Sequence, residues 1–505
     1  MKTIAVITVL IALAMMTLQP LAAKDQTGLK FTKIPAPNSP LIAFRIILRS
    51  GSINDPAGKE GLNALTADLI VQGGTRDLTY SQVVEKLYPW AANIDVQTDQ
   101  EITTFVGNVH RDHLDGFYTL LSQLLLAPRF DPADFERVKD LHLNYLQNEL
   151  RAVNDEQLGK QALNGAIFAG HPYGTTEMGT VRGITAITLD DVKRFYREKY
   201  TRANLWIGIA GGYPETLPGQ MEKDFASLPA GTFAEIPLPA PAAVKSMEVT
   251  VVEKPTRAYA VSMGYPIAIN RKDKDYYPLL LANSYFGEHR TFNGVLMNHL
   301  RGLRGLNYGD YSYAEKFVGG LGQPPFPEVN TPLRQQFFSI WLRPVQPENT
   351  HFAIRNALWE LKKLVDQGIS KDDFEITRKF VLNYSKLWAG TISRRLGYQM
   401  DSEFYGTDYF IDRIDKELRA LTVDDVNAAI KKYLQAGNIK IVVVVDEGKG
   451  KSFLDNLTNN APSPIRYQSP VSQSILDQDK EIQVFPLSVN RETSRVVPAK
   501  ELFEK

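Results

Sequence analysis

The chain contains 505 residues, enough for three domains of average size or two large ones. Lysine and arginine number 57, as do aspartate and glutamate, so the formal net charge is zero. This balance argues against a nucleic-acid-binding protein, which usually carries an excess of basic residues. The absence of cysteine excludes disulfides, thiolate catalysis and iron–sulfur clusters, so any metal would be held by carboxylates and the seven histidines.

The first 23 residues have the pattern of a secretory signal peptide. Lys2 supplies a positive charge, residues 4–18 are apolar apart from two threonines, and Ala22 and Ala23 are small residues suited to cleavage. The apolar stretch is shorter than the roughly 20 residues that a membrane-spanning helix needs. We therefore expect cleavage and an exported protein without a membrane anchor, located in the periplasm or secreted.

The mature chain begins with a pattern typical of mixed strands and helices. Alternating apolar residues predict a hairpin of two strands, Leu29 to Ile34 and Leu41 to Leu48. Helical spacing follows at 61–71, 81–88, 114–126, 132–151 and 188–200, with strands within 92–109 and at 205–209. Because strands and helices do not alternate strictly, the fold class is α+β.

A segment rich in proline and alanine, 228–246, reads as a linker between two domains, 24–227 and 247–447. After it the pattern restarts, with strands at 249–252 and 258–263 and a helix at 274–286. The remaining residues, 448–505, are polar and interrupted by proline and serine. We expect them to form an extended C-terminal arm.

An internal repeat supports two similar domains. The segment that starts at Thr188 with Thr-Leu-Asp-Asp contains a predicted helix and leads to a strand that begins at Asn204. Thr-Val-Asp-Asp at Thr422 leads in the same way, and at the same spacing, to Asn438. Each threonine is a good helix N-cap and each asparagine suits a turn. We interpret the two copies as the ends of two duplicated halves.

One segment has the frame of a zinc site without its chemistry. His-x-x-Glu-His on a helix places two zinc ligands on one face and a glutamate that activates the bound water. Residues 61–75 resemble the segment Gly-x-x-His-x-x-Glu-His…Gly-Thr of the insulinase-like (pitrilysin) metallopeptidase family, with one extra residue before Gly-Thr. Ala64, Ala67 and Asp68 stand where this family has His, Glu and His.

The resemblance covers almost the whole mature chain. It includes His171-Pro-Tyr-Gly174, the strand 204–212, and Arg301 followed seven residues later by Tyr308. It implies two similar halves, each a mostly antiparallel sheet packed with helices, which enclose a chamber with one zinc site in the N-terminal half. It also implies that Arg301 and Tyr308 face this site, position the substrate backbone and support the transition state.

The departure from the motif decides the predicted function. Two alanines neither bind zinc nor move a proton, and the family's distal glutamate ligand falls near 144–149, where Glu149 lacks its partners. We expect no metal or other cofactor in this chain. Some members of the family work as two chains, one of which has lost the zinc motif. The resemblance thus implies a non-catalytic, substrate-binding subunit of a heterodimeric zinc metalloendopeptidase, with a zinc-bearing insulinase-like partner and peptide substrates.

Several alternatives stay open from the sequence. The chain could be a peptide-binding scaffold without an enzymatic role, or an autonomous peptidase whose atypical metal site uses Asp68, Glu149 or His110. Without the resemblance, Arg301 reads as a surface arginine at a helix C-terminus and Tyr308 as a half-buried core tyrosine.

Three further positions have structural alternatives to a functional role. Arg304, one turn after Arg301, is expected to support or replace it. The segment His110-Arg-Asp-His113 lies at a strand-to-helix junction, where Asp112 or Asp115 would serve as a cap. His171 is expected to belong to a rigid turn.

Overall fold

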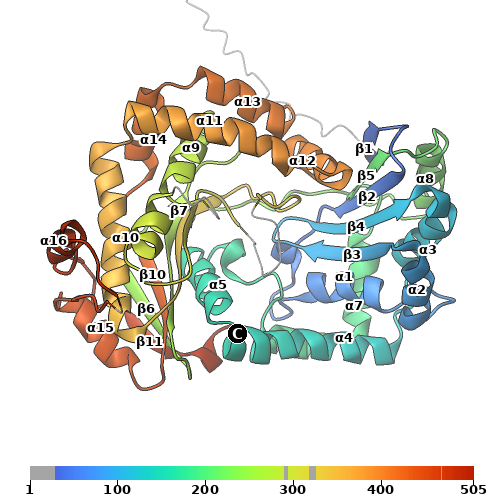
Figure 1. Ribbon diagram of the computed structural model, residues 1–505. Helices are drawn as coiled ribbons and strands as arrows, with labels where there is room; N and C mark the ends of the chain where they lie inside the picture. Colours follow the sequence, from blue (N-terminus) through green and yellow to red (C-terminus); the bar gives the residue numbers. More distant parts are fainter. Residues whose placement is uncertain (1–28, 289–293, 318–325, 468) are drawn as a thin grey trace, which may run out of the picture.

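A computed structural model describes residues 29–288, 294–317, 326–467 and 469–505 (Figure 1). The predicted signal peptide, 1–23, lies outside these residues. Two halves, each a sheet with its helices, lie side by side, and 48% helix with 17% strand confirms the α+β class. Within the described ranges, no helix combines the length and the apolar character that crossing a bilayer requires.

The first half contains a sheet whose described strands have the order β1-β5-β2-β4-β3. Its strands are β1 (Lys30–Pro35), β2 (Leu41–Leu48), β3 (Asn93–Thr98), β4 (Thr103–His110) and β5 (Leu205–Gly211). Its helices are α1 (Leu62–Gln72), α2 (Tyr80–Leu87), α3 (Leu114–Leu126), α4 (Pro132–Asn144), α5 (Asp155–Ile167), α6 (Val181–Ala186), α7 (Leu189–Lys199) and α8 (Leu217–Phe225).

The second half contains a sheet whose described strands have the order β11-β6-β10-β7-β9-β8. Its strands are β6 (Glu248–Glu253), β7 (Tyr259–Ile267), β8 (Asp310–Tyr313), β9 (Gln336–Val345), β10 (Lys440–Val445) and β11 (Arg495–Pro498). Its helices are α9 (Tyr276–Phe286), α10 (Pro347–Gln367), α11 (Lys371–Trp388), α12 (Ile392–Tyr405), α13 (Phe410–Ala420), α14 (Val423–Tyr433), α15 (Gly450–Thr458) and α16 (Gln473–Ile482).

The predicted hairpin at the start of the chain is wrong, although both of its strands exist. β1 pairs in parallel with β5, and β5 pairs on its other edge with β2 in antiparallel fashion. The last strand of the half therefore lies between the first two. The turn from Ala36 to Pro40 is long enough to bridge two strand spacings of about 4.8 Å each, so local alternation could not reveal the intervening strand.

The two sheets have the same internal plan, which matches the predicted duplication. If β11 is set aside, the fifth strand of each half lies between the first and the second, and the fourth pairs with the third. Thr188 and Thr422 each cap a helix, α7 and α14, and in both cases the aspartate three residues later completes a capping box. β11 is an additional edge strand of the second sheet.

The two halves exchange a helix. α5, from the first half of the chain, packs on β7 and β10 of the second sheet, where Leu158 and Leu163 share a core with Val442 and Val444. In return, α12 covers β1, β2 and β5 of the first sheet. Figure 1 shows both crossings, α5 beneath β7 and α12 reaching towards β1.

The predicted linker and arm differ in how they fold. Residues 229–245 contain no helix or strand. The segment 448–505 is not an extended arm, because it forms α15, α16 and β11. Its spaced apolar residues join the core of the second half, which the overall polarity of the segment concealed, namely Phe453, Leu454, Leu457, Ile482 and Leu487.

Candidate functional site: the altered zinc helix and the Arg301–Tyr308 pair

Helix α1 carries the altered zinc motif, and its alanines are part of the core. Ala64 and Ala67 are fully buried. Methyl groups offer no lone pair to a metal and no proton to a substrate. The carboxylate of Asp55 accepts hydrogen bonds from the backbone N–H groups of Gly61 and Asn63 at 2.7 Å each and so fixes the start of the helix. Burial nevertheless raises the pKa of Asp55 to about 7.

Asp68 has a partner that the sequence analysis missed. Its Oδ2 atom lies 2.7 Å from Nε2 of His142, which is buried on α4. The buried face of α4 comprises Phe135, Val138 and His142, spaced three and four residues apart. This spacing is the signal that could have marked His142 as an inward-facing histidine.

The residues present do not fit a zinc ion. In the described ranges there is no group of three or more His, Asp or Glu side chains placed to hold a metal. Asp68 and His142 are hydrogen-bonded to each other. Even as ligands, these two side chains would fall short of the three that catalytic zinc sites use. We therefore derive no catalytic step through a metal in this chain.

The other candidate ligands have partners of their own. Glu149 lies on a π-helical segment, Tyr145–Val153, and its hydrogen-bond partner is Asn144 at 3.4 Å. His110 accepts a hydrogen bond from the backbone N–H of Asp112 and caps a short turn, while His113 stacks on Trp90. His110 is thus itself the cap, where we expected an aspartate.

His171 forms the rigid turn that we expected. Its Nδ1 atom accepts a hydrogen bond from the N–H of Tyr173 at 3.0 Å. Its ring packs against Phe168 and Tyr173.

Arg301 and Tyr308 lie together in the second half. The Arg301 guanidinium is 4.8 Å from the centre of the Tyr308 ring. Tyr308 is 70% exposed, so it is not the half-buried core residue of the alternative interpretation. The turn that presents it is held by Asn307, which donates to Asp310 at 2.6 Å and to the carbonyl of Arg343 at 2.9 Å.

Arg304 has a structural role and does not support Arg301 in the way we expected. Its side chain is completely buried, and Nε donates to Asp479 of α16 at 2.8 Å. A further hydrogen bond links it to the carbonyl of His299 at 2.9 Å. Arg304 therefore anchors α16 and is unable to contact a substrate.

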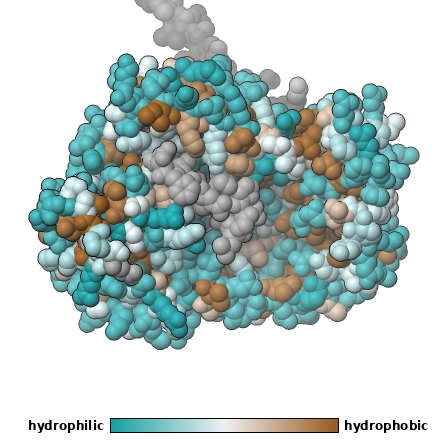
Figure 2. Space-filling view, viewed as in Figure 1, coloured by the Kyte–Doolittle hydropathy of each residue, from teal (hydrophilic) through white to brown (hydrophobic). Residues whose placement is uncertain are grey.

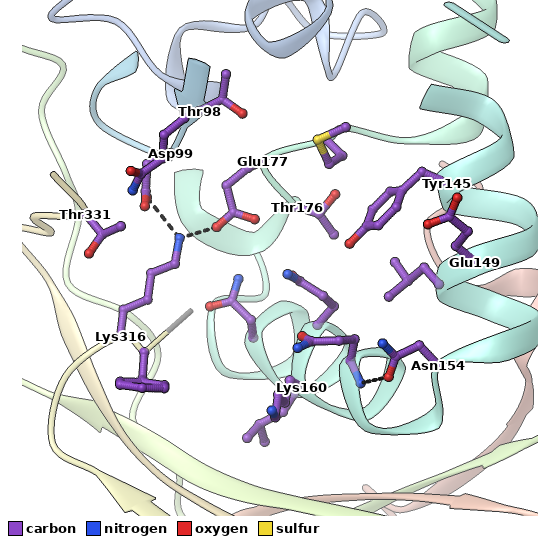
Figure 3. Close-up of a pocket in the computed structure, with 18 of the residues that line it drawn as sticks. Thr98, Asp99, Tyr145, Glu149, Asn154, Lys160, Thr176, Glu177, Lys316 and Thr331 are labelled. Atoms are coloured by element: carbon purple, nitrogen blue, oxygen red, sulfur yellow. Dashed lines mark hydrogen bonds and ion pairs between the residues drawn. The ribbon is translucent and has the colours of Figure 1, made fainter. Parts of the chain in front are cut away.

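A cavity of about 390 Å³ lies between the halves. Lys316 reaches into it from the second half and donates to Asp99, at 2.9 Å, and to Glu177, both in the first half. Burial raises the pKa of Asp99 to about 6, although Lys316 acts against it. Tyr145 and Glu149 lie on the opposite side of the cavity from Lys316 (Figure 3).

The cavity is joined to the Arg301–Tyr308 wall by charged residues. Lys160 and Trp341 line the cavity, and the Lys160 ammonium lies 3.8 Å from the centre of the Trp341 ring. Lys160 also pairs with Glu156 at 2.7 Å, and Glu156 pairs with Arg343 at 3.1 Å. Arg343 in turn contacts Tyr308. In the space-filling view, the surface between the halves is recessed (Figure 2).

Comparison with known proteins identifies the family. Residues 34–181 match the family model described as insulinase (peptidase family M16), and residues 186–380 match the one described as peptidase M16 inactive domain. A protein of Helicobacter pylori named non-peptidase homolog YmxG is 24% identical over 419 residues, which cover 81% of this chain and 89% of that protein. The mitochondrial-processing peptidase subunit beta of Dictyostelium discoideum is 24% identical over 35% of this chain and 38% of its own.

Solved structures show the same fold. A peptidase M16 inactive domain from Pseudomonas fluorescens superposes with a TM-score of 0.72 and 20% identity, covering 88% of this chain and 98% of its own. The periplasmic protease PqqL from Escherichia coli superposes with a TM-score of 0.62 and 15% identity over 92% of this chain, which spans half of PqqL. With two family models matching consecutive segments and this fold, the chain belongs to the insulinase-like (M16) peptidase family and lacks the zinc motif of its active members.

Proposed function

We propose that this chain is the non-catalytic, substrate-binding subunit of an exported heterodimeric zinc metalloendopeptidase. The observation that carries the proposal is the contrast between the two walls. The helix that would bind zinc presents two buried alanines, whereas Tyr308 is exposed and in contact with Arg301. Substrate positioning and water activation are separate tasks, so a chain that has lost one is able to retain the other.

The partner would be an insulinase-like chain with an intact His-x-x-Glu-His motif and its zinc. One relative is a subunit of the mitochondrial-processing peptidase, which supports a multi-chain enzyme. The pattern of residues 1–23 and the similarity to a periplasmic protease support export to the periplasm. The first argument rests on sequence shared with that subunit. The second rests on the pattern of residues 1–23 and on the fold shared with that protease.

The test is reconstitution. The mature chain is co-purified with the zinc-bearing chain that it captures from native extract, and the pair is assayed on unstructured peptides. We expect peptide cleavage by the pair, none by this chain alone, and a loss of at least about tenfold in kcat/KM with Arg301→Ala, because a positioned cation near the reacting carbonyl is removed. The matched control is Arg419→Ala, whose side chain is exposed and paired with Asp415 on α13.

Three outcomes count against the proposal. These are the absence of a zinc-bearing partner, a pair in which Arg301→Ala cleaves as fast as the parent, and a solitary chain that holds stoichiometric zinc and hydrolyses peptides. The name non-peptidase homolog, given to the Helicobacter pylori relative, favours a second candidate function, a peptide-binding protein with no enzymatic role. Tight peptide binding by the lone chain with no peptidase partner would support that candidate.

A further inference from the structure

A second arginine lies against Tyr308. The guanidinium of Arg343, on β9, is 5.3 Å from the centre of the Tyr308 ring, compared with 4.8 Å for Arg301. The ring is therefore held by two cations and not by burial. Arginine stacked on an aromatic ring keeps a planar set of N–H donors in a fixed orientation. Arg343 is not among the residues that the family resemblance marked for this site.

The described residues that these contacts link to Tyr308 carry more positive than negative charge. Arg343 and Lys160 share one carboxylate, that of Glu156. Burial acts to raise the pKa of Glu156, but these two cations hold that pKa below its usual value. Asp310 lies beneath the site, and burial raises its pKa to about 8, so it does not neutralise Arg301 at neutral pH. Among these described residues there are thus three cations and one carboxylate whose pKa is held low.

We propose that Arg301, Arg343 and Tyr308 form a carboxylate-binding site, which takes the C-terminal carboxylate or an acidic side chain of a bound peptide. This inference rests on the proposed function, since it specifies which peptides the wall selects. A neutral backbone carbonyl would leave the cations to repel each other, whereas a carboxylate accepts paired hydrogen bonds from a guanidinium and relieves that repulsion.

The site is already adapted to such a ligand. Nε of Arg343 donates a hydrogen bond to Glu156 at 3.1 Å, which orients that guanidinium. The hydroxyl of the exposed Tyr308 adds a neutral hydrogen-bond donor. Glu156 belongs to α5, the helix that the first half contributes to the second. The site therefore depends on the association of the two halves.

The experiment compares three fluorescein-labelled ten-residue peptides of one neutral, unstructured sequence, bound to the full mature chain at low salt. The first has a free C-terminal carboxylate, the second a C-terminal amide, and the third an amide together with one internal aspartate. We expect the two acidic peptides to bind about five- to twentyfold more tightly than the neutral amide. The relative affinity of the two acidic peptides identifies the source of the carboxylate.

Two substitutions are expected to change this preference in opposite directions. Arg343→Gln removes a cation and should bring the acidic-to-neutral affinity ratio to about one, whereas Glu156→Gln removes the competing carboxylate and should raise the ratio at least about twofold. A folding defect would not produce opposite changes. The control Arg419→Gln, on α13, should leave the ratio as in the parent chain.

Equal binding of the acidic and neutral peptides, or a ratio that Arg343→Gln does not alter, overturns the carboxylate site and leaves the substrate-binding role intact. Failure of all three peptides to bind refutes both proposals together. The two failures are therefore distinguishable in one titration series.

Discussion

At the scale of single residues, the pairing of Asp68 with His142 shows what has replaced metal ligation. Where the family resemblance places a zinc-binding histidine, this chain has a carboxylate that contacts a histidine of α4 at 2.7 Å. A charge-assisted hydrogen bond of this kind links α1 to α4 without a metal ion. Ala64 and Ala67 pack into the core on the same helix, so α1 now contributes stability and no ligand.

A second residue-scale feature is the buried carboxyl of Asp310. Its Oδ2 atom is buried and has no hydrogen-bond partner in the described ranges, and burial raises the pKa to about 8. The folded chain therefore binds this proton more tightly than the unfolded chain, whose aspartate has a pKa near 3.9. The stabilisation is complete below about pH 4 and is lost as the pH rises through about 8.

We predict that Asp310→Asn removes this pH dependence. Between about pH 4 and pH 8, the free energy of unfolding of the parent chain should include a contribution that falls by about 1.4 kcal/mol per pH unit. Asparagine is neutral throughout, so the variant should gain on the parent as the pH rises. Urea unfolding at pH 5, 7 and 9 measures this difference. A constant difference between the two proteins across these values would contradict the assigned direction of the pKa.

At the scale of elements, the exchanged helices α5 and α12 make the two halves interdependent. Leu396 and Met400 of α12 form a buried cluster with Ile47 and Trp206 of the first sheet. That sheet has its other face covered by its own helices, including α3. Without α12, an apolar face would be exposed to water at a cost of about 25 cal/mol per Å².

We predict that Leu396→Ala destabilises the whole chain by about 2–5 kcal/mol, since it leaves a cavity between α12 and the first sheet. The matched control is Leu387→Ala on α11, where the leucine is 59% exposed and the expected change is within about 0.5 kcal/mol. Chemical unfolding followed by tryptophan fluorescence gives both values. Similar losses for the two variants would show that α12 contributes little to the first half.

The elements themselves were largely predictable, but their partners were not. Helices such as α7 and α14 carry their own capping boxes and apolar spacing, which are local signals. The position of β5 between β1 and β2, and the packing of α5 on the distant sheet, depend on contacts that no local pattern encodes. The family resemblance marked Arg301 and Tyr308, and the spacing on α4 could have marked His142 as facing inward, but no local pattern linked His142 to Asp68 or Arg343 to Tyr308.

At the scale of the molecule, several buried or partly buried polar contacts cross from one half to the other. Arg334 pairs with Glu101 at 2.9 Å, and Arg45 donates to Asn330 at 2.7 Å. Near the cavity, Lys316 is shared between two carboxylates of the first half. Buried ion pairs contribute little net stability compared with apolar packing, but breaking one is costly. Such a seam favours a single relative placement of the halves.

We predict that Lys316→Gln destabilises the chain by about 3 kcal/mol or more, because Asp99 and Glu177 then remain buried together without a cation. Burial already raises the pKa of Asp99 to about 6 in the presence of Lys316, so in the variant both carboxyls should take up protons more readily. The deficit relative to the parent chain should therefore be larger at pH 8 than at pH 5, and adding Asp99→Asn should restore part of the loss.

Lys362→Gln, which breaks an exposed pair with Asp366, is the control and should cost less than about 1 kcal/mol. The free energy of unfolding is measured at both pH values, and the rate of proteolysis within the connection 229–245 is measured alongside it. A deficit independent of pH would mean that these carboxylates do not depend on Lys316 for their charge, and that the seam is held by its other contacts.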